Sequence, residues 1–302
     1  MLAKLEGYAA ALVGTVSDDD LQRAVKQLES VDAMIQTRGD LRAALTDTAI
    51  SPVARAAVLR ELLSGKVDDL VVRLAAYAAR VSAGQDLPSV LSDLTYNIVA
   101  HARHEPYVHT QLSLLAARKR VAGFADAILE DLETDQFVNI EDDLFRWART
   151  IEANLELRRI LVDRDAPLES RTQLVRSLLS GKVSDASLKL ALFVIEGGRP
   201  RDVVGTLDYL VDYTAKARDW RVARVWSARA LDDEAKAALV QSLIVITGHP
   251  VELQIVDDPS LLGGVLIQVG DLRLDATTKG RLGALHDSIA AGTSGELLNR
   301  NS

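Results

Sequence analysis

One stretch of the chain carries residue types that could bind a metal ion. On a helix, His101, His104 and Glu105 would lie near one face, and two imidazoles with a carboxylate are ligands that zinc accepts; His109 follows shortly after. The order His-x-x-His-Glu, however, differs from the zinc-protease motifs, and Pro106 interrupts the helix. We therefore expect a linker here, with neither a metal nor another cofactor.

A second candidate is the glycine pair Gly263-Gly264, which could be mistaken for a phosphate-binding loop. The chain has no Gly-x-x-x-x-Gly-Lys-Ser/Thr motif, and the pair precedes the apolar run that starts at Val265 instead of opening a helix. A bulge or a close backbone contact explains the glycines better. Because no nucleophile, base and oxyanion site come together anywhere in the sequence, we predict that this chain is not an enzyme.

Composition limits the classes of partner. The chain has 302 residues, of which 48% are hydrophobic, so sizeable cores can form, and a net charge of −8 argues against binding to nucleic acid. The basic run Arg118-Lys119-Arg120 is short and is interpreted as a solvated linker. There is no cysteine, and the apolar runs are far shorter than the ~20 residues that cross a bilayer. We expect no direct membrane insertion by this chain.

The elements that position these residues come in two copies. Leu63-Ser-Gly-Lys-Val67 returns as Leu179-Ser-Gly-Lys-Val183, 116 residues later. At this offset and without gaps, residues 41–96 match residues 157–212 at 18 of 56 positions. Such self-similarity indicates duplication of one structural unit. We predict an extra helical bundle at residues 1–115 and a second bundle at residues 116–217.

Apolar spacing within the first copy is helical. Leu21, Leu28 and Ile35 recur on one helical face, and Ser51-Pro52 is typical of a helix start. The helix that starts there is expected to carry Val58, Leu59, Leu62 and Leu63 on one apolar face. Gly65 is expected to end it in the left-handed conformation. Residues 67–83 are apolar on most sides and predict a central helix, followed by a helix at 87–102. Leu74 and its counterpart Leu190 are expected in the two cores.

The pattern changes after Ala217. Residues 220–229 and 251–256 alternate as strands do, and Asp232 or Asp233 can cap a helix between them. Two further short strands would meet at Gly270-Asp271, and a last helix would start at Thr277 or Thr278. The predicted fold class is mainly α: two tandem homologous helical bundles followed by a small α+β domain at residues 218–302.

The run from Asp258 to Asp271, followed by Asp275 and Gly280-Arg281, resembles the C-terminal signature of the ATP synthase delta subunit, also called oligomycin-sensitivity-conferring protein. The resemblance continues back through Glu196-Gly-Gly-Arg to a helix that opens near Phe124. Thr277-Thr278 and Pro200 depart from the family pattern. The signature residues, to which the resemblance gives a structural role, are Gly263, Gly264, Gly270, Asp275, Gly280 and Arg281.

The resemblance implies a non-catalytic peripheral-stalk subunit of a rotary ATP synthase, on the cytoplasmic face of the bacterial membrane. Its implied partners are the N-terminal helix of an alpha subunit and a subunit b or b-like stalk helix. The extra bundle resembles subunit b–delta fusions, in which a membrane-anchored segment would precede Met1. The alternative is a helical-repeat adaptor unrelated to ATP synthase. The alpha-subunit interface is expected between the first and central helices of the second bundle, at Phe124, Ala127, Ile128, Leu188, Leu192 and Ile195.

Overall fold

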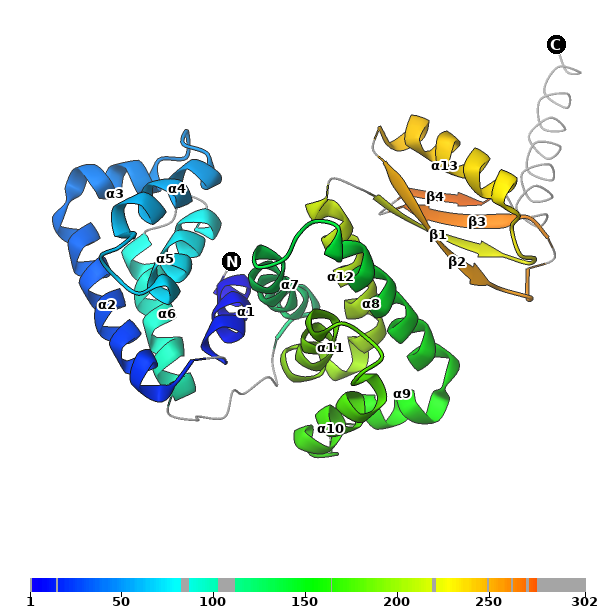
Figure 1. Cartoon of the computed structure of the whole chain (residues 1–302), viewed down its shortest axis with the longest axis horizontal. Helices are drawn as coiled ribbons and strands as arrows, with labels where there is room; N and C mark the ends of the chain where they lie inside the picture. Colours follow the sequence, from blue (N-terminus) through cyan, green and yellow to red (C-terminus); the bar gives the residue numbers. More distant parts are fainter. Residues whose placement is uncertain are drawn as a thin grey trace, which may run out of the picture. The chain divides into compact units, whose positions relative to one another are not determined.

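Each copy of the repeat folds into six α-helices in the computed structural model (Figure 1), which describes residues 2–14, 16–82, 87–102, 112–163, 165–218, 221–248, 250–261, 263–269 and 272–275. The helices of the first bundle are α1 (Leu2–Val13), α2 (Asp18–Thr37), α3 (Gly39–Thr46), α4 (Pro52–Leu63), α5 (Asp69–Val81) and α6 (Leu87–Ala102). Those of the second are α7 (Leu114–Glu130), α8 (Gln136–Ala153), α9 (Leu155–Val162), α10 (Leu168–Leu179), α11 (Asp185–Gly197) and α12 (Val203–Ala217), with a 3₁₀ turn at Pro200–Asp202.

The bounds of α3, α4 and α5 recur in α9, α10 and α11 at the same 116-residue offset, as duplication requires. Contacts divide the chain into two compact units, Met1–Leu210 and Val211–Ser302, so both bundles belong mainly to the first unit. The finer division at residues 115 and 217 stays a prediction.

Local signals in the sequence explain where the helices begin and end. The Ser51 hydroxyl accepts the amide hydrogen of Ala54 at 3.2 Å and so caps α4, which begins at Pro52. Gly65 and Gly181 both adopt positive φ, at 71° and 73°, as residues that follow a helix end often do. These predictions are confirmed. The prediction that Val58 lies on the buried face of α4 was wrong. Val58 is 43% exposed because it points away from the core that Leu59 and Leu63 enter.

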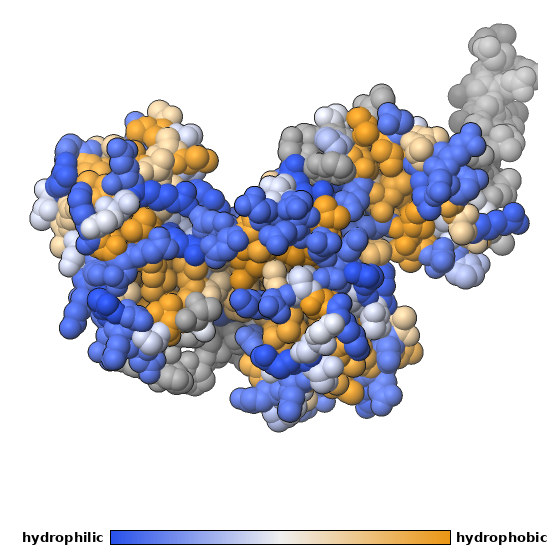
Figure 2. Space-filling view, in the orientation of Figure 1, coloured by the Kyte–Doolittle hydropathy of each residue, from blue (hydrophilic) through white to orange (hydrophobic). Residues whose placement is uncertain are grey.

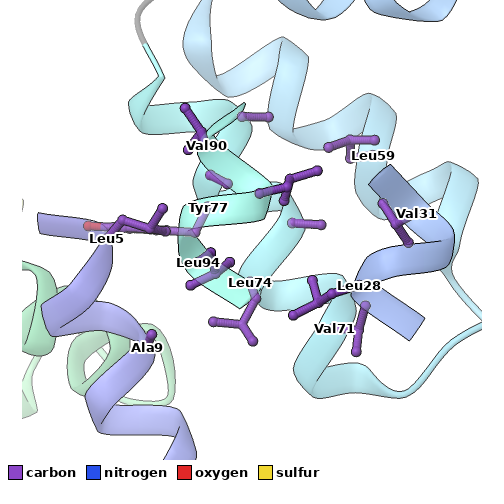
Figure 3. Packing of buried hydrophobic residues seen from close by; sticks show 14 of the residues in the cluster. Leu5, Ala9, Leu28, Val31, Leu59, Val71, Leu74, Tyr77, Val90 and Leu94 are labelled. Atoms are coloured by element: carbon purple, nitrogen blue, oxygen red, sulfur yellow. The ribbon is translucent and has the colours of Figure 1, made fainter. Parts of the chain in front are cut away.

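The core of the first bundle gathers apolar side chains from all of its helices. Figure 3 shows Leu28 and Val31 from α2, Leu59 from α4 and Leu74 from α5 converging on the same interior. Leu74 has no exposed surface, and neither has its counterpart Leu190 in the second bundle, which confirms both as core residues.

Buried polar contacts repeat along with the apolar pattern. In the first bundle the guanidinium of Arg55 donates to the carbonyl of Leu45 at 3.3 Å. In the second bundle the equivalent residues, both 116 positions later, make the same contact: Arg171 donates to the carbonyl of Leu161 at 3.4 Å. Asp143 accepts the amide hydrogen of Ser184 at 3.1 Å, directly before α11. Each buried arginine therefore ties the end of one helix to the next.

The second unit carries a four-stranded sheet with the order β2-β1-β3-β4. Its strands are β1 (Arg221–Ser227), β2 (Val251–Asp257), β3 (Val265–Val269) and β4 (Leu272–Asp275); β1 pairs parallel with β2 and antiparallel with β3. Helix α13 (Asp233–Thr247), capped by Asp232 and ended by Gly248 at φ 70°, packs its Leu243 against Ala223 and Val225 of β1. The fold is thus mainly α with a small α+β part. The helix expected after Thr277 lies outside the described residues.

None of the described helices combines the length and the apolar character that a membrane span requires.

Candidate functional site

The predicted alpha-subunit interface falls on α7 and α11, which pack directly on each other. Phe124, Ile128 and Leu188 are half-buried, whereas Ala127, Leu192 and Ile195 are buried. The rings of Phe124 and Phe193 stack at 3.9 Å between centroids with an interplanar angle of 11°, so the space between the two helices is filled. The interface remains a prediction, with its accessible part on the ridge formed by the three half-buried side chains.

Charged side chains lie on the same two helices, α7 and α11. The buried guanidinium of Arg120 lies over the Phe193 ring at 5.5 Å. Burial raises the pKa of Glu196, and the positive charges of Arg176 and Arg120 oppose that rise. Arg118 pairs with Asp202 at 3.0 Å. The interpretation of residues 118–120 as a solvated linker was therefore wrong, because these residues belong to α7 and two of them are engaged by the second bundle.

Ala127 faces the first bundle. It lies in the same buried cluster as Leu5 and Tyr8 of α1, where α1 and α7 cross. The crossing is reciprocal: a Cβ on Gly7 would lie 1.7 Å from the carbonyl oxygen of Arg120, and a Cβ on Gly123 would lie 1.7 Å from that of Lys4. Gly123 lies 116 residues after Gly7, and Arg120 lies 116 residues after Lys4, so the two opening helices meet through equivalent residues at backbone contact.

A row of acidic side chains on α7 binds the first bundle around this crossing. Asp126 accepts hydrogen bonds from Tyr77 at 2.5 Å and Arg80 at 3.2 Å, and pairs with Lys4 at 2.9 Å. Glu130 accepts from the Tyr8 hydroxyl, and burial together with this hydrogen bond raises the pKa of Tyr8.

Further ionic contacts come from α4 and α5. Arg60 donates to Glu130, and Arg73 pairs with Asp131 at 3.1 Å. No sequence pattern indicates this network, because its donors lie 46 to 122 residues from their acceptors. The two bundles are therefore joined by both backbone contact and charge.

Sequence patterns also did not predict an apolar groove on the second bundle. It is a cavity of about 550 Å³ between α8, α9 and α10. The full set of lining residues is Asp143, Arg146, Trp147, Thr150, Asn154, Glu156, Leu157, Ile160, Leu174, Leu178, Leu179, Lys182 and Val183. Figure 2 shows apolar atoms among polar ones on this bundle's surface. One difference between the two copies could have indicated the groove: Val31 of the first copy is replaced by the larger, aromatic Trp147 at the equivalent position of the second.

The signature glycines of the α+β part adopt special backbone angles. Gly263 has φ 141° and Gly264 has φ 81°, backbone angles that residues with a side chain rarely adopt. Asp275 ends β4. Gly270, Gly280 and Arg281 lie outside the described residues, and nothing tests their role.

The histidine stretch lies almost wholly outside the described residues. His101 falls in α6, but its side chain is not among those described, and neither His104, Glu105 nor His109 is. Among the residues that the structure describes, no group of three or more His, Asp or Glu side chains could hold a metal ion.

Comparisons with known proteins agree with the duplication. The profile of the family described as "ATP synthase delta (OSCP) subunit" matches residues 6–106 and again residues 121–289. The chain is 34% identical to the ATP synthase subunit delta of Corynebacterium urealyticum, over 86% of this chain and 85% of that protein. It is 32% identical to that of Nocardia farcinica, over 94% of this chain and 95% of the relative.

Among solved structures, a chain of the mitochondrial ATP synthase hexamer of Toxoplasma gondii aligns with a TM-score of 0.41 and 15% identity, covering 57% of this chain and 97% of that chain. Because the alignment with the Nocardia protein spans 286 residues, that relative includes both copies of the bundle.

Proposed function

Because the chain belongs to the ATP synthase delta (OSCP) subunit family, we propose that it works as a peripheral-stalk subunit of a rotary, proton-translocating ATP synthase. The family match across both bundles and most of the α+β part carries this proposal. In this role the chain has no active site of its own. It holds the catalytic head still relative to the membrane sector, on the cytoplasmic face of the membrane, while a central shaft turns.

Holding the head requires that force pass through the chain without the two bundles separating. The reciprocal contact at Gly7 and Gly123 supports this role, since backbone against backbone leaves no flexible side chain between the helices. The salt bridges of Asp126 with Lys4 and Arg80 add contacts that resist sliding.

For the head, the proposed partner is the N-terminal helix of an alpha subunit, bound as an amphipathic helix on the second bundle. Phe124, Ile128 and Leu188 supply the accessible contact, whereas Leu192 and Ile195 are buried core residues and Ala127 is buried against the first bundle. The α+β part is proposed to bind the end of a subunit b or b-like stalk helix. A b-like membrane segment ahead of Met1 remains a prediction.

The proposal is tested with membranes from cells that lack this chain. Without it, we expect ATP hydrolysis by the head to persist while ATP-driven proton pumping is lost, because the head turns instead of the shaft. Adding the purified chain should restore pumping, measured by quenching of a pH-sensitive dye. Proton pumping at the normal rate in its absence would refute a role in the stator.

A second measurement locates the alpha helix. Leu188→Asp places a charge on the proposed ridge, and Val72→Asp places one at the equivalent, equally half-buried position of the first bundle. After circular dichroism has shown that both variants are folded, we expect only Leu188→Asp to weaken binding of a synthetic alpha N-terminal peptide to the full chain. Equal binding by both variants would exclude this ridge.

A further inference from the structure

The groove between α8, α9 and α10 has the length and chemistry of a helix-binding surface. Its contacts along α8 run from Asp143 through Trp147 to Asn154, the residue that directly follows the helix, which is three turns along one face, or roughly 16 Å. Leu157 from α9 and Leu178 from α10 line the apolar interior. This groove is separate from the α7–α11 ridge.

The apolar surface continues out of the groove. Leu155 and Ile160 on α9 are 76% and 41% exposed, although both are large aliphatic residues. In the first bundle the position of Ile160 is held by Ala44, and that of Trp147 by the smaller Val31. At these two positions the second copy carries larger and more apolar side chains than the first, as expected for a surface that binds a partner.

One polar group at the rim indicates what the partner must carry. The indole of Trp147 is only 4% exposed and its N–H is buried, so this group lies out of reach of a partner. Lys66 of the first copy donates to the carbonyl of Leu62 at 2.7 Å. Its counterpart Lys182 makes no such bond within the described chain and is exposed at the rim of the groove, where it can pair with a carboxylate.

We propose that this groove binds an amphipathic helix from another subunit of the ATP synthase, a helix distinct from the one on the α7–α11 ridge. The helix presents apolar side chains at three- and four-residue spacing and an acidic residue for Lys182. This inference rests on the proposed function, because the partner is taken from that assembly.

Site-directed cross-linking in the assembled enzyme tests the proposal. The chain contains no cysteine, so Ile160→Cys provides a unique attachment point for a benzophenone maleimide. Ala44→Cys is the matched control at the equivalent position of the first bundle. In purified ATP synthase we expect the label at position 160, but not at 44, to cross-link to another subunit. Mass spectrometry should map that cross-link to an amphipathic helical sequence.

Three outcomes would overturn the inference. They are an assembled enzyme without a cross-link from position 160, equal cross-linking from both positions, and a cross-link to a polar loop. If the unsubstituted chain does not enter the enzyme at all, the proposed function fails first and the inference with it.

Two substitutions then examine the chemistry of the groove. Leu174→Asp should abolish the cross-link from position 160, whereas Val58→Asp, its counterpart in the first bundle, should leave the cross-link unchanged. Lys182→Gln keeps much of the side-chain length but removes the positive charge, so binding of the mapped helix as a peptide should weaken roughly two- to fivefold. Unchanged affinity in Lys182→Gln would remove the acidic residue from the proposal, and an unchanged cross-link in a folded Leu174→Asp variant would refute the groove.

Discussion

The crossing of α1 and α7 should be disrupted by a single methyl group. Gly123→Ala introduces a Cβ that would lie 1.7 Å from the carbonyl oxygen of Lys4. An ordinary carbon–oxygen contact is about 3.3 Å, so the helices must separate by roughly 1.5 Å. No side chain can rotate away, because the obstructing atoms belong to the backbone.

The expected loss of stability follows from two opposing terms. Overpacking in a rigid core costs about 1–3 kcal/mol, and a backbone clash belongs at the upper end of that range. Replacing glycine by alanine inside a helix returns about 0.5–1 kcal/mol. We therefore expect a net destabilisation of about 2 kcal/mol. Gly7→Ala should cost less in the Gly123→Ala background than alone, since the helices are then already apart.

Urea denaturation followed by circular dichroism measures this effect. Gly39→Ala is the matched control, because a Cβ there meets nothing within 4 Å and should leave stability unchanged or slightly raised. If the free energy of unfolding of Gly123→Ala equalled that of the control, the close backbone contact between the two helices would be refuted.

Three further outcomes are expected. Leu74→Ala and Leu190→Ala, which empty fully buried positions, should each cost about 2–5 kcal/mol by urea denaturation, and a loss below about 1 kcal/mol would contradict their place in the cores. Gly264→Val forces a β-branched residue to φ 81° and should lower the melting temperature of the α+β part alone; calorimetry showing that transition unmoved would disprove the strain. The pKa of Tyr8 is raised on folding, so its contribution is present below about pH 10 and is lost at higher pH. Tyr8→Phe should therefore flatten the fall in stability above pH 10, and an identical fall in both proteins would exclude Tyr8 as its source.

Sequence patterns predicted the elements whose causes are local. The cap at Ser51, the left-handed Gly65 and the strand at residues 221–227 each depend on a few neighbouring residues, so they could be recognised from type and spacing. The duplication was recognisable for a different reason, since it requires only comparison of the chain with itself.

What could not be predicted depends on contacts between distant residues. Gly7 and Gly123 look like ordinary helical glycines, and nothing in their neighbourhoods shows that each meets the backbone of the other helix. Asp126 was indistinguishable from a solvated surface acid until Tyr77 and Arg80 were placed beside it. The groove at Trp147 likewise needed three helices in position before its apolar residues could be seen to form one surface.

The reciprocal crossing also imposes an order on biosynthesis. Helix α1 leaves the ribosome before α7, and Gly123, against which Lys4 packs, is translated more than a hundred residues after Lys4. At 5–20 residues per second, α1 waits for roughly 6 to 24 s. During that interval its glycine face, the hydroxyl of Tyr8 and the ammonium of Lys4 lack their native partners on α7. The nascent chain therefore carries an unmatched helix face that only completion of α7 can cover, which makes the first bundle dependent on a helix that is translated after it.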